Sequence, residues 1–228
     1  MTYQANCNIQ FNEILEQLNI VVPPRGNQRT TEHSETWIIH RALSILYFNG
    51  FITFPISIEK SEKPDYWFNM SGTTYGVELT EIIHPDYAKV QTLPEAQCDK
   101  SVSNPSLFKW GQPKRNIKEL REIAALDIVT GRPWMGDSVE REFAQSIVDT
   151  VKGKQKKLAS HYKRADLDIL LIYHNQSSPM LNINKGLKYT NEKLADFWIQ
   201  GFKVIAIIKY DKLLWLTKHS TKIFQLER

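Results

Sequence analysis

KPDYWFNMSGTTYGVELTEI, residues 63–82, is the most informative stretch of the 228-residue chain. Aromatic and β-branched residues are concentrated in 66–70 and 74–82, which is typical of strands, and Ser71-Gly72 between them is a turn pair. A proline directly before Asp65 fixes the backbone at the entry to the first strand. The stretch therefore predicts two adjacent strands joined by a tight turn.

Two carboxylates, Asp65 and Glu78, lie on these strands. Successive side chains on a strand alternate between its faces, so Glu78 shares a face with Gly76 and Thr80, whereas Glu81 lies on the other face and is interpreted as structural. Burying an unpaired carboxylate costs free energy, and a metal ion or a basic partner removes that cost. Mg²⁺ prefers one or two carboxylates together with water and phosphate oxygens. The pair indicates a metal site; the alternative is a turn-capping aspartate and a strand glutamate paired with an arginine.

The patterns on either side of these strands predict an α/β fold. Apolar residues recur at helical spacing in 9–19, and a second helix begins at Thr30 or Thr31 and ends at Asn49-Gly50. The other expected elements are helices over 117–126, 139–162 and 191–200, and strands over 51–58, 167–173, 203–208, 213–216 and 223–226. This order predicts a mixed central β-sheet flanked by helices. We expect a single domain over 1–228, with its core over about 30–210 and an irregular insertion over about 84–137.

Composition excludes several classes of protein. The chain is 42% hydrophobic with 10 Gly and 10 Pro, which excludes collagen-like and disordered sequences. Cys7 and Cys98 are too few and too far apart for a disulfide scaffold. The first residues do not resemble an export signal, and the longest apolar runs are of strand length, so we expect a cytoplasmic protein without a membrane span. The net charge of +4 does not by itself indicate a nucleic-acid partner.

The sequence over about residues 32–173 resembles the PD-(D/E)XK nuclease superfamily, which has the restriction-endonuclease-like fold. The resemblance rests on Lys63-Pro64-Asp65, the turn that follows, and Gly76-Val77-Glu78-Leu79-Thr80, after a helix that begins with acidic residues. It implies a nuclease that depends on Mg²⁺ or Mn²⁺. It also implies Asp65, Glu78 and the main-chain carbonyl of Leu79 as metal ligands. Glu35, or less well Glu32, would be the acidic residue of the first helix that completes the catalytic group.

The chain departs from the superfamily pattern at Thr80, which stands where the motif has a lysine and can carry no charge. Some members of the superfamily place that lysine on a neighbouring helix. Lys154 lies on the apolar stripe of the helix expected over 139–162, three residues after Val151 and four before Leu158. A lysine that faces a core needs a partner, which the two carboxylates would provide. Lys154 is therefore the candidate catalytic lysine, and the alternative is that its ammonium extends to solvent.

Basic residues are concentrated in 109–121 and 152–164, where few acidic residues offset them. Cations beside a carboxylate site fit a phosphate backbone, or else form solvated helix faces. Trp110 and Trp134 in the insertion could stack on bases or pack as a lid. The candidate nucleic-acid-binding residues are Lys114, Arg115, Lys152 and Lys157.

We expect a metal-dependent endonuclease that acts on nucleic acid, on DNA in preference to RNA, and that dimerises if it cuts both strands. One alternative is a catalytically inactive binding module on the same fold, because Thr80 replaces the motif lysine. Another is a small-molecule or protein-interaction domain in which the acidic pair is structural.

Overall fold

The computed structural model describes residues 2–26, 28–97, 104–125, 131, 133–161, 165–198 and 201–226. Within these residues, eight strands form one sheet whose spatial order follows the chain. The strand pairs β4–β5 and β5–β6 are parallel, and the other neighbours are antiparallel. The strands are β1 (Thr2–Ala5), β2 (Ile56–Lys60), β3 (Tyr66–Met70), β4 (Thr73–Ile82), β5 (Leu167–His174), β6 (Val204–Lys209), β7 (Lys212–Leu216) and β8 (Thr221–Gln225). The predicted mixed sheet is confirmed.

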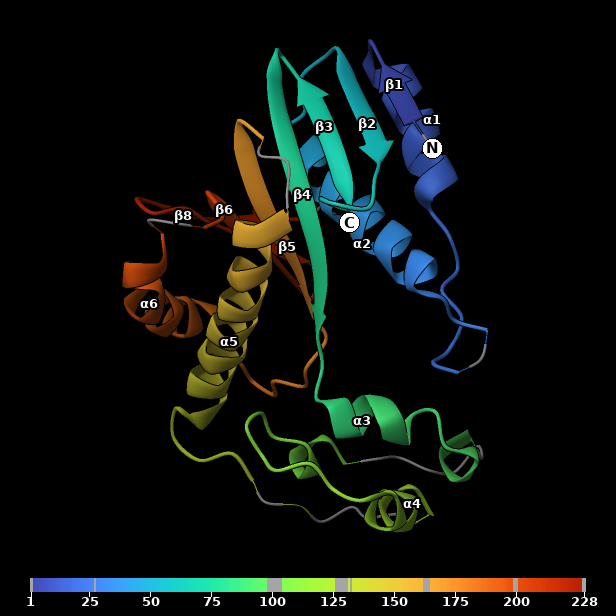
Figure 1. Ribbon diagram of the computed structural model, residues 1–228, viewed down its shortest axis with the longest axis vertical. Helices are drawn as coiled ribbons and strands as arrows, with labels where there is room; N and C mark the ends of the chain where they lie inside the picture. Colours follow the sequence, from blue (N-terminus) through green and yellow to red (C-terminus); the bar gives the residue numbers. More distant parts are fainter. Residues whose placement is uncertain are drawn as a thin grey trace.

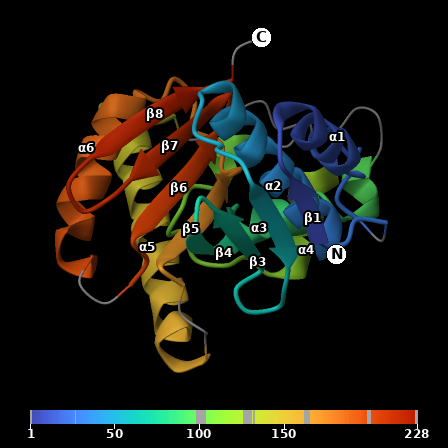
Figure 2. The same cartoon turned by 90° about the horizontal axis from the view of Figure 1, so that it is seen from above.

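Helices cover both faces of the sheet (Figure 2). The helices α1 (Asn8–Leu18) and α2 (Thr31–Phe48) pack on one face, and α5 (Ser138–His161) and α6 (Ile183–Leu194) pack on the other. Alternation along β4 separates the two cores, because Val77 and Leu79 contribute to the first and Ile82 to the second. The predicted arrangement, a sheet flanked by helices, is therefore confirmed.

The start of α2 is fixed by its own sequence. The Thr30 side chain accepts a hydrogen bond from the main-chain N–H of His33, and the His33 ring accepts one from the main-chain N–H of Thr30. These reciprocal bonds satisfy N–H groups that a helix start leaves without partners. They fix the start of α2 at its N-cap, Thr30, directly after Arg29.

The insertion was expected to be irregular apart from one helix over 117–126. That helix is confirmed over Ile117–Ala125, but the expectation is wrong for the rest of the described insertion, which contains three further short helices. Four short helices pack around a core of their own, next to the end of β4 (Figure 1). Proline ends a helix in its interior but suits its first turn, and Pro85, Pro94 and Pro105 each begin one of them. The helices are α3 (Pro85–Val90), η1 (Pro94–Gln97), η2 (Pro105–Leu107) and α4 (Ile117–Ala125), and the core residues are Val90, Leu93, Phe108, Leu120 and Ala124.

Three other boundaries differ from prediction. The strand expected over 51–58 begins only at Ile56, because Pro55 has no N–H to donate to a sheet. The helix expected over 191–200 begins at Ile183, where Asn182 accepts a hydrogen bond from the main-chain N–H of Lys185, and continues into the 3₁₀ helix η3 (Ala195–Phe197). The sheet also extends beyond the expected core of 30–210, because it includes β1 and β8. Among the described helices, none has the length and apolar character needed to cross a bilayer.

Candidate active site at the open edge of β4

The candidate site lies where β3 and β4 separate. The pairing between these strands ends at Tyr66 and Val77, whereas β4 remains paired with β5 as far as Ile82. Beyond Val77, the edge of β4 that faced β3 therefore lacks a strand partner. The main-chain groups of Leu79 point to this open edge and bind side chains instead.

Asp65, directly before β3, supplies the first of these side chains. Its Oδ2 accepts a hydrogen bond of 2.6 Å from the main-chain N–H of Leu79. The turn that carries it lies close to β4, since a Cβ added to Gly76 would approach the ring of Pro64 to 3.2 Å. Glycine at position 76 thus permits the close approach that brings Asp65 to Leu79.

Lys154 of α5 supplies the second side chain. Its Nζ donates to Glu78 Oε1 at 2.7 Å and to the main-chain carbonyl of Leu79 at 2.9 Å. The Glu78 side chain is 7% exposed and that of Lys154 is 21% exposed, so the ion pair is largely shielded from solvent. The structure therefore places Lys154 on the inward face of α5, as its helical phase predicts, and against one of the two predicted carboxylates.

The surroundings of Asp65 disfavour the charged form of its carboxylate. The pKa of Asp65 is raised to about 6, chiefly by burial and in part by the charges of Glu78 and Glu35. The hydrogen bond from Leu79 and the charge of Lys154 act in the opposite direction. A carboxylate whose charge is disfavoured by its surroundings gains from binding a positive ion.

Glu35 lies near enough to Asp65 to raise its pKa, but in the described part of the chain it does not form a metal-holding group with Asp65 and Glu78. It lies on α2, on the other side of the sheet from α5, and forms an ion pair of 3.5 Å with Lys60. The same ammonium binds Glu32 at 2.9 Å. In the described part of the chain, no group of three or more His, Cys, Asp or Glu side chains could hold a metal ion. Two carboxylates and the Leu79 carbonyl are thus the oxygen donors that the site offers.

These donors fit a hard divalent cation. Carboxylate and carbonyl oxygens are the ligands that Mg²⁺ and Mn²⁺ prefer. The ammonium of Lys154 already rests between two of the three predicted ligand atoms, Glu78 Oε1 and the Leu79 carbonyl oxygen. The site therefore holds a positive charge at the position where the resemblance implies a metal ion.

The predicted nucleic-acid-binding residues have different surroundings. Lys114 and Lys152 are exposed, and Lys152 lies over the ring of Phe197. Arg115 is turned into the insertion, where its guanidinium donates to the Leu107 carbonyl at 2.6 Å. The side chain of Lys157 lies outside the described residues.

The two insertion tryptophans are packed rather than extended. The indole N–H of Trp110 donates to Asp149, and that of Trp134 donates to Glu142. Both acceptors belong to α5. Two roles were expected for these tryptophans, stacking on bases and packing. The contacts correspond to packing of the insertion.

The structure also reveals a pocket that the sequence does not predict. A cavity of about 400 Å³ opens beside the edge of β4 and is lined by Leu79, Thr80, Glu35 and two arginines, Arg25 and Arg29. Arg25 forms an ion pair with Glu81, which also accepts a hydrogen bond from Asn175. The structural role expected for Glu81 agrees with these contacts. Arg25 and Arg29 lie in a loop, where no helical or strand periodicity predicts the direction of a side chain. Their charge is the only sequence signal that could have identified them as candidate binding residues.

Comparison with known proteins adds no assignment: no family model matches the chain, and neither the curated proteins nor the solved structures include a significant match.

Proposed function

We propose that this protein is a metal-dependent nuclease that hydrolyses phosphodiester bonds in nucleic acid, with DNA as the preferred substrate. One observation carries the proposal: Asp65, Glu78, the Leu79 carbonyl and the Lys154 ammonium meet where β3 leaves β4. Each group matches the element implied by the resemblance to the PD-(D/E)XK superfamily, with the lysine supplied by α5. The restriction-endonuclease-like fold is part of the same proposal.

Asp65, Glu78 and the Leu79 carbonyl would hold Mg²⁺ or Mn²⁺. A cation in such a site polarises the phosphate and makes a water molecule nucleophilic at neutral pH. Asp65 is positioned by the Leu79 N–H, which keeps its second oxygen available for other contacts. The protein's own contribution is thus a set of oxygens held near one another, two of which Lys154 must release before the cation can bind.

Lys154 supplies positive charge to the same place. In hydrolysis, the oxygen of water bonds to phosphorus, and the bond from phosphorus to a sugar oxygen breaks. Negative charge develops on the phosphate oxygens, and an ammonium that donates to them stabilises the transition state. Lys154 can act in this way once it gives up its bond to the Leu79 carbonyl. Thr80 is then not required to carry charge.

Cleavage assays test the proposal. Purified protein is incubated with supercoiled plasmid, single-stranded DNA and RNA, with Mg²⁺ or Mn²⁺ and with EDTA. We expect cleavage that requires the cation and is lost in Asp65→Asn and in Glu78→Gln. The control is Asp166→Asn, because Asp166 also accepts a main-chain N–H of β4, that of Thr74, but lies away from the site.

Failure to cut any of these substrates would contradict the proposed activity. Binding of nucleic acid without cutting would support the inactive module, in which Lys154 replaces the cation permanently. If the protein neither binds nucleic acid nor takes up Mn²⁺, the result would support the alternative in which Asp65 and Glu78 have only a structural role. If duplex DNA is cut on both strands, we expect a homodimer, because each protomer contributes one set of catalytic groups.

A further inference from the structure

The pocket beside the candidate active site has the chemistry of a phosphate-binding site. Its lining includes Arg25 and Arg29, which carry guanidinium groups, and Thr30, Thr31 and Ser34, which carry hydroxyl groups. Guanidinium groups and hydroxyl groups are the usual donors to phosphate oxygens. The cavity of about 400 Å³ is large enough for a nucleotide unit.

Both carboxylates of the pocket have a basic partner, although Glu35 shares its partner with Glu32. Glu81 is paired with Arg25, and Glu35 is paired with Lys60. Among the described residues, no carboxylate lies within ion-pair distance of Arg29, whose Nε donates to Ser34 Oγ at 3.1 Å. Arg29 therefore provides positive charge that an anion in the pocket could use.

The position of the pocket relates it to the proposed reaction. Leu79 lines the cavity, and its main-chain carbonyl binds Lys154. Thr92 of the insertion also lines the cavity. A strand of nucleic acid with one phosphate at the carboxylates would therefore place an adjacent nucleotide between α2 and the insertion.

We propose that this pocket binds the phosphate next to the one that is cleaved, with Arg29 as its principal ligand. The inference rests on the proposed function for the identity of the substrate. The proposal gives Arg29 a role in binding the substrate and in determining which phosphate lies at the active site. The hydrolysis itself would take place at Asp65 and Glu78. Arg25 would contribute when the substrate competes with Glu81 for its guanidinium.

The test measures binding without catalysis. Fluorescence anisotropy of a labelled single-stranded oligonucleotide is recorded in EDTA over a series of salt concentrations. We expect Arg29→Gln to weaken binding about tenfold and to reduce the slope of log affinity against log salt by about one. Arg29→Lys should retain the slope but bind more weakly than wild type, because an ammonium cannot form the bidentate contact. Thermal unfolding of both variants shows whether the fold is kept.

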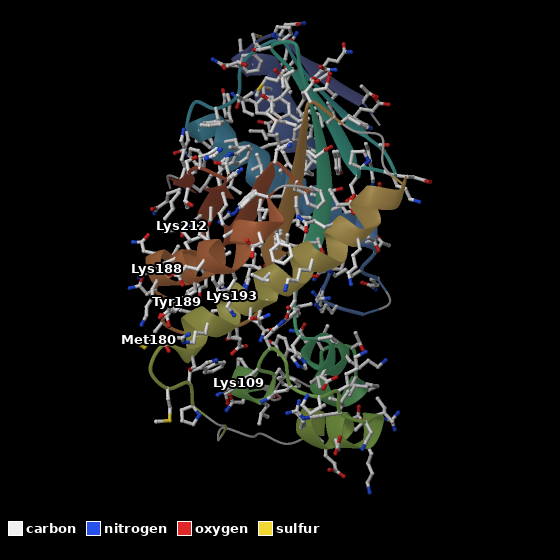
Figure 3. The ribbon with its side chains drawn as sticks, turned by 60° about the vertical axis from the view of Figure 1, so that its left-hand side comes forward. Lys109, Met180, Lys188, Tyr189, Lys193 and Lys212 are labelled. Carbon is white, nitrogen blue, oxygen red and sulfur yellow. The ribbon has the colours of Figure 1, made fainter. Side chains whose placement is uncertain are left out.

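The control is Lys188→Gln, which removes the same charge from an exposed position on α6. Figure 3 shows Lys188 on the surface of α6, and Figures 1 and 2 place this helix on the side of the molecule away from the N-terminal loop. We expect Lys188→Gln to bind as wild type does.

Inorganic phosphate and a mononucleotide are added as competitors. Competition by the mononucleotide at lower concentration than inorganic phosphate supports a nucleotide subsite, whereas equal competition overturns it in favour of a simple anion site.

The two proposals fail in distinguishable ways. If Arg29→Gln binds with wild-type affinity and salt slope, the pocket inference is wrong, even if cleavage depends on Asp65. If binding depends on Arg29 but no substrate is cut, the pocket assignment holds as a phosphate site and the proposed hydrolysis is wrong.

Discussion

The carboxylate of Asp65 lies where its ionised form lowers the stability of the folded protein. Its pKa of about 6 lies above the usual 3.8, chiefly because of burial. The folded protein therefore holds this proton more tightly than the unfolded chain does. As pH rises from about 4 to about 6, the free energy of unfolding falls, and the loss persists at neutral pH.

We therefore predict that Asp65→Asn stabilises the metal-free protein at pH 7 by about 1–2 kcal/mol, a value reduced for partial solvent exposure. The amide can still accept the Leu79 N–H, and the unfavourable charge is gone. Urea unfolding in EDTA at pH 7 and at pH 4 measures the effect, which should vanish at pH 4. Asp166→Asn, which alters the exposed cap on Thr74, should not stabilise at either pH. Destabilisation by Asp65→Asn at pH 7 would show that Asp65 serves only as a cap.

Lys154 and a divalent cation would compete for the same oxygens. Lys154→Met keeps most of the length of the side chain but leaves Glu78 buried without its ammonium. We predict that this variant loses about 3 kcal/mol of stability in EDTA, because an uncompensated buried charge is costly. We also predict that it binds Mn²⁺ more tightly than wild type while cleavage is lost. Mn²⁺ should thus raise its melting temperature more than that of wild type.

Lys152→Met on the same helix is the matched control, because Lys152 is exposed and its charge faces Phe197. It should show wild-type stability and Mn²⁺ affinity. Equal stabilisation of wild type and Lys154→Met by Mn²⁺ would contradict the competition. Calorimetric titration with Mn²⁺ gives the affinities directly.

The direction of the Lys154 side chain could be predicted because side chains on a helix return to the same face with each turn. Val151 and Leu158 lie on the predicted apolar face, and the spacing places Lys154 between them on that face. The pairing with Glu78 followed from the cost of burying either charge alone. Arg29 could not be found in this way, because it lies in a loop where neighbouring residues do not determine direction. Glu35 was placed on the correct helix, but the sequence does not show that Lys60 would bind it.

At the scale of elements, α6 is held against α5 by close packing. A Cβ added to Gly186 would lie 2.8 Å from the ring of Phe143, which is buried. We predict that Gly186→Ala destabilises the protein by about 1–3 kcal/mol despite the better helix propensity of alanine, because the ring has little room to move. Thermal or urea unfolding measures this change.

Gly153→Ala on α5 is the control for helix propensity. A Cβ at Gly153 meets no atom within 4 Å, so alanine should stabilise the protein by up to about 1 kcal/mol. Opposite signs for the two substitutions would establish that packing, and not propensity, determines the outcome at Gly186. If both variants are stabilised, the close contact with Phe143 does not constrain the fold.

Regular elements with clear patterns were predictable, and short or proline-bounded ones were not. Strand β3 was predicted with its observed bounds, because aromatic residues and a Ser-Gly turn delimit it. The four-residue strand β1 is too short to show a period, and its place depends on pairing with β2. In the insertion, Pro85, Pro94 and Pro105 begin short helices whose common core becomes apparent only in three dimensions.

At the scale of the whole molecule, the insertion is a separately packed unit that α5 connects to the sheet. Glu142 is central to this connection: its Oε1 accepts the main-chain N–H of Trp110 at 2.7 Å, and its Oε2 accepts the indole N–H of Trp134 at 2.8 Å. Gln176, after β5, adds a bond to the carbonyl of Phe108. The insertion also lines the proposed phosphate pocket through Thr92. Its position therefore matters for binding as well as for stability.

We predict that Glu142→Ala loosens the insertion while the sheet stays folded. Hydrogen bonds to a charged group contribute about 1.5–3 kcal/mol each, so the loss of two should increase local opening at least tenfold. Hydrogen exchange followed by mass spectrometry should show faster exchange in α3 and α4 and unchanged exchange in β4, β5 and β6. Glu192→Ala, on the exposed face of α6, should change neither region. If exchange accelerates equally in the sheet and the insertion, the two units unfold together. In the expected case, oligonucleotide affinity in EDTA should also fall, because the wall containing Thr92 is no longer held beside Arg29.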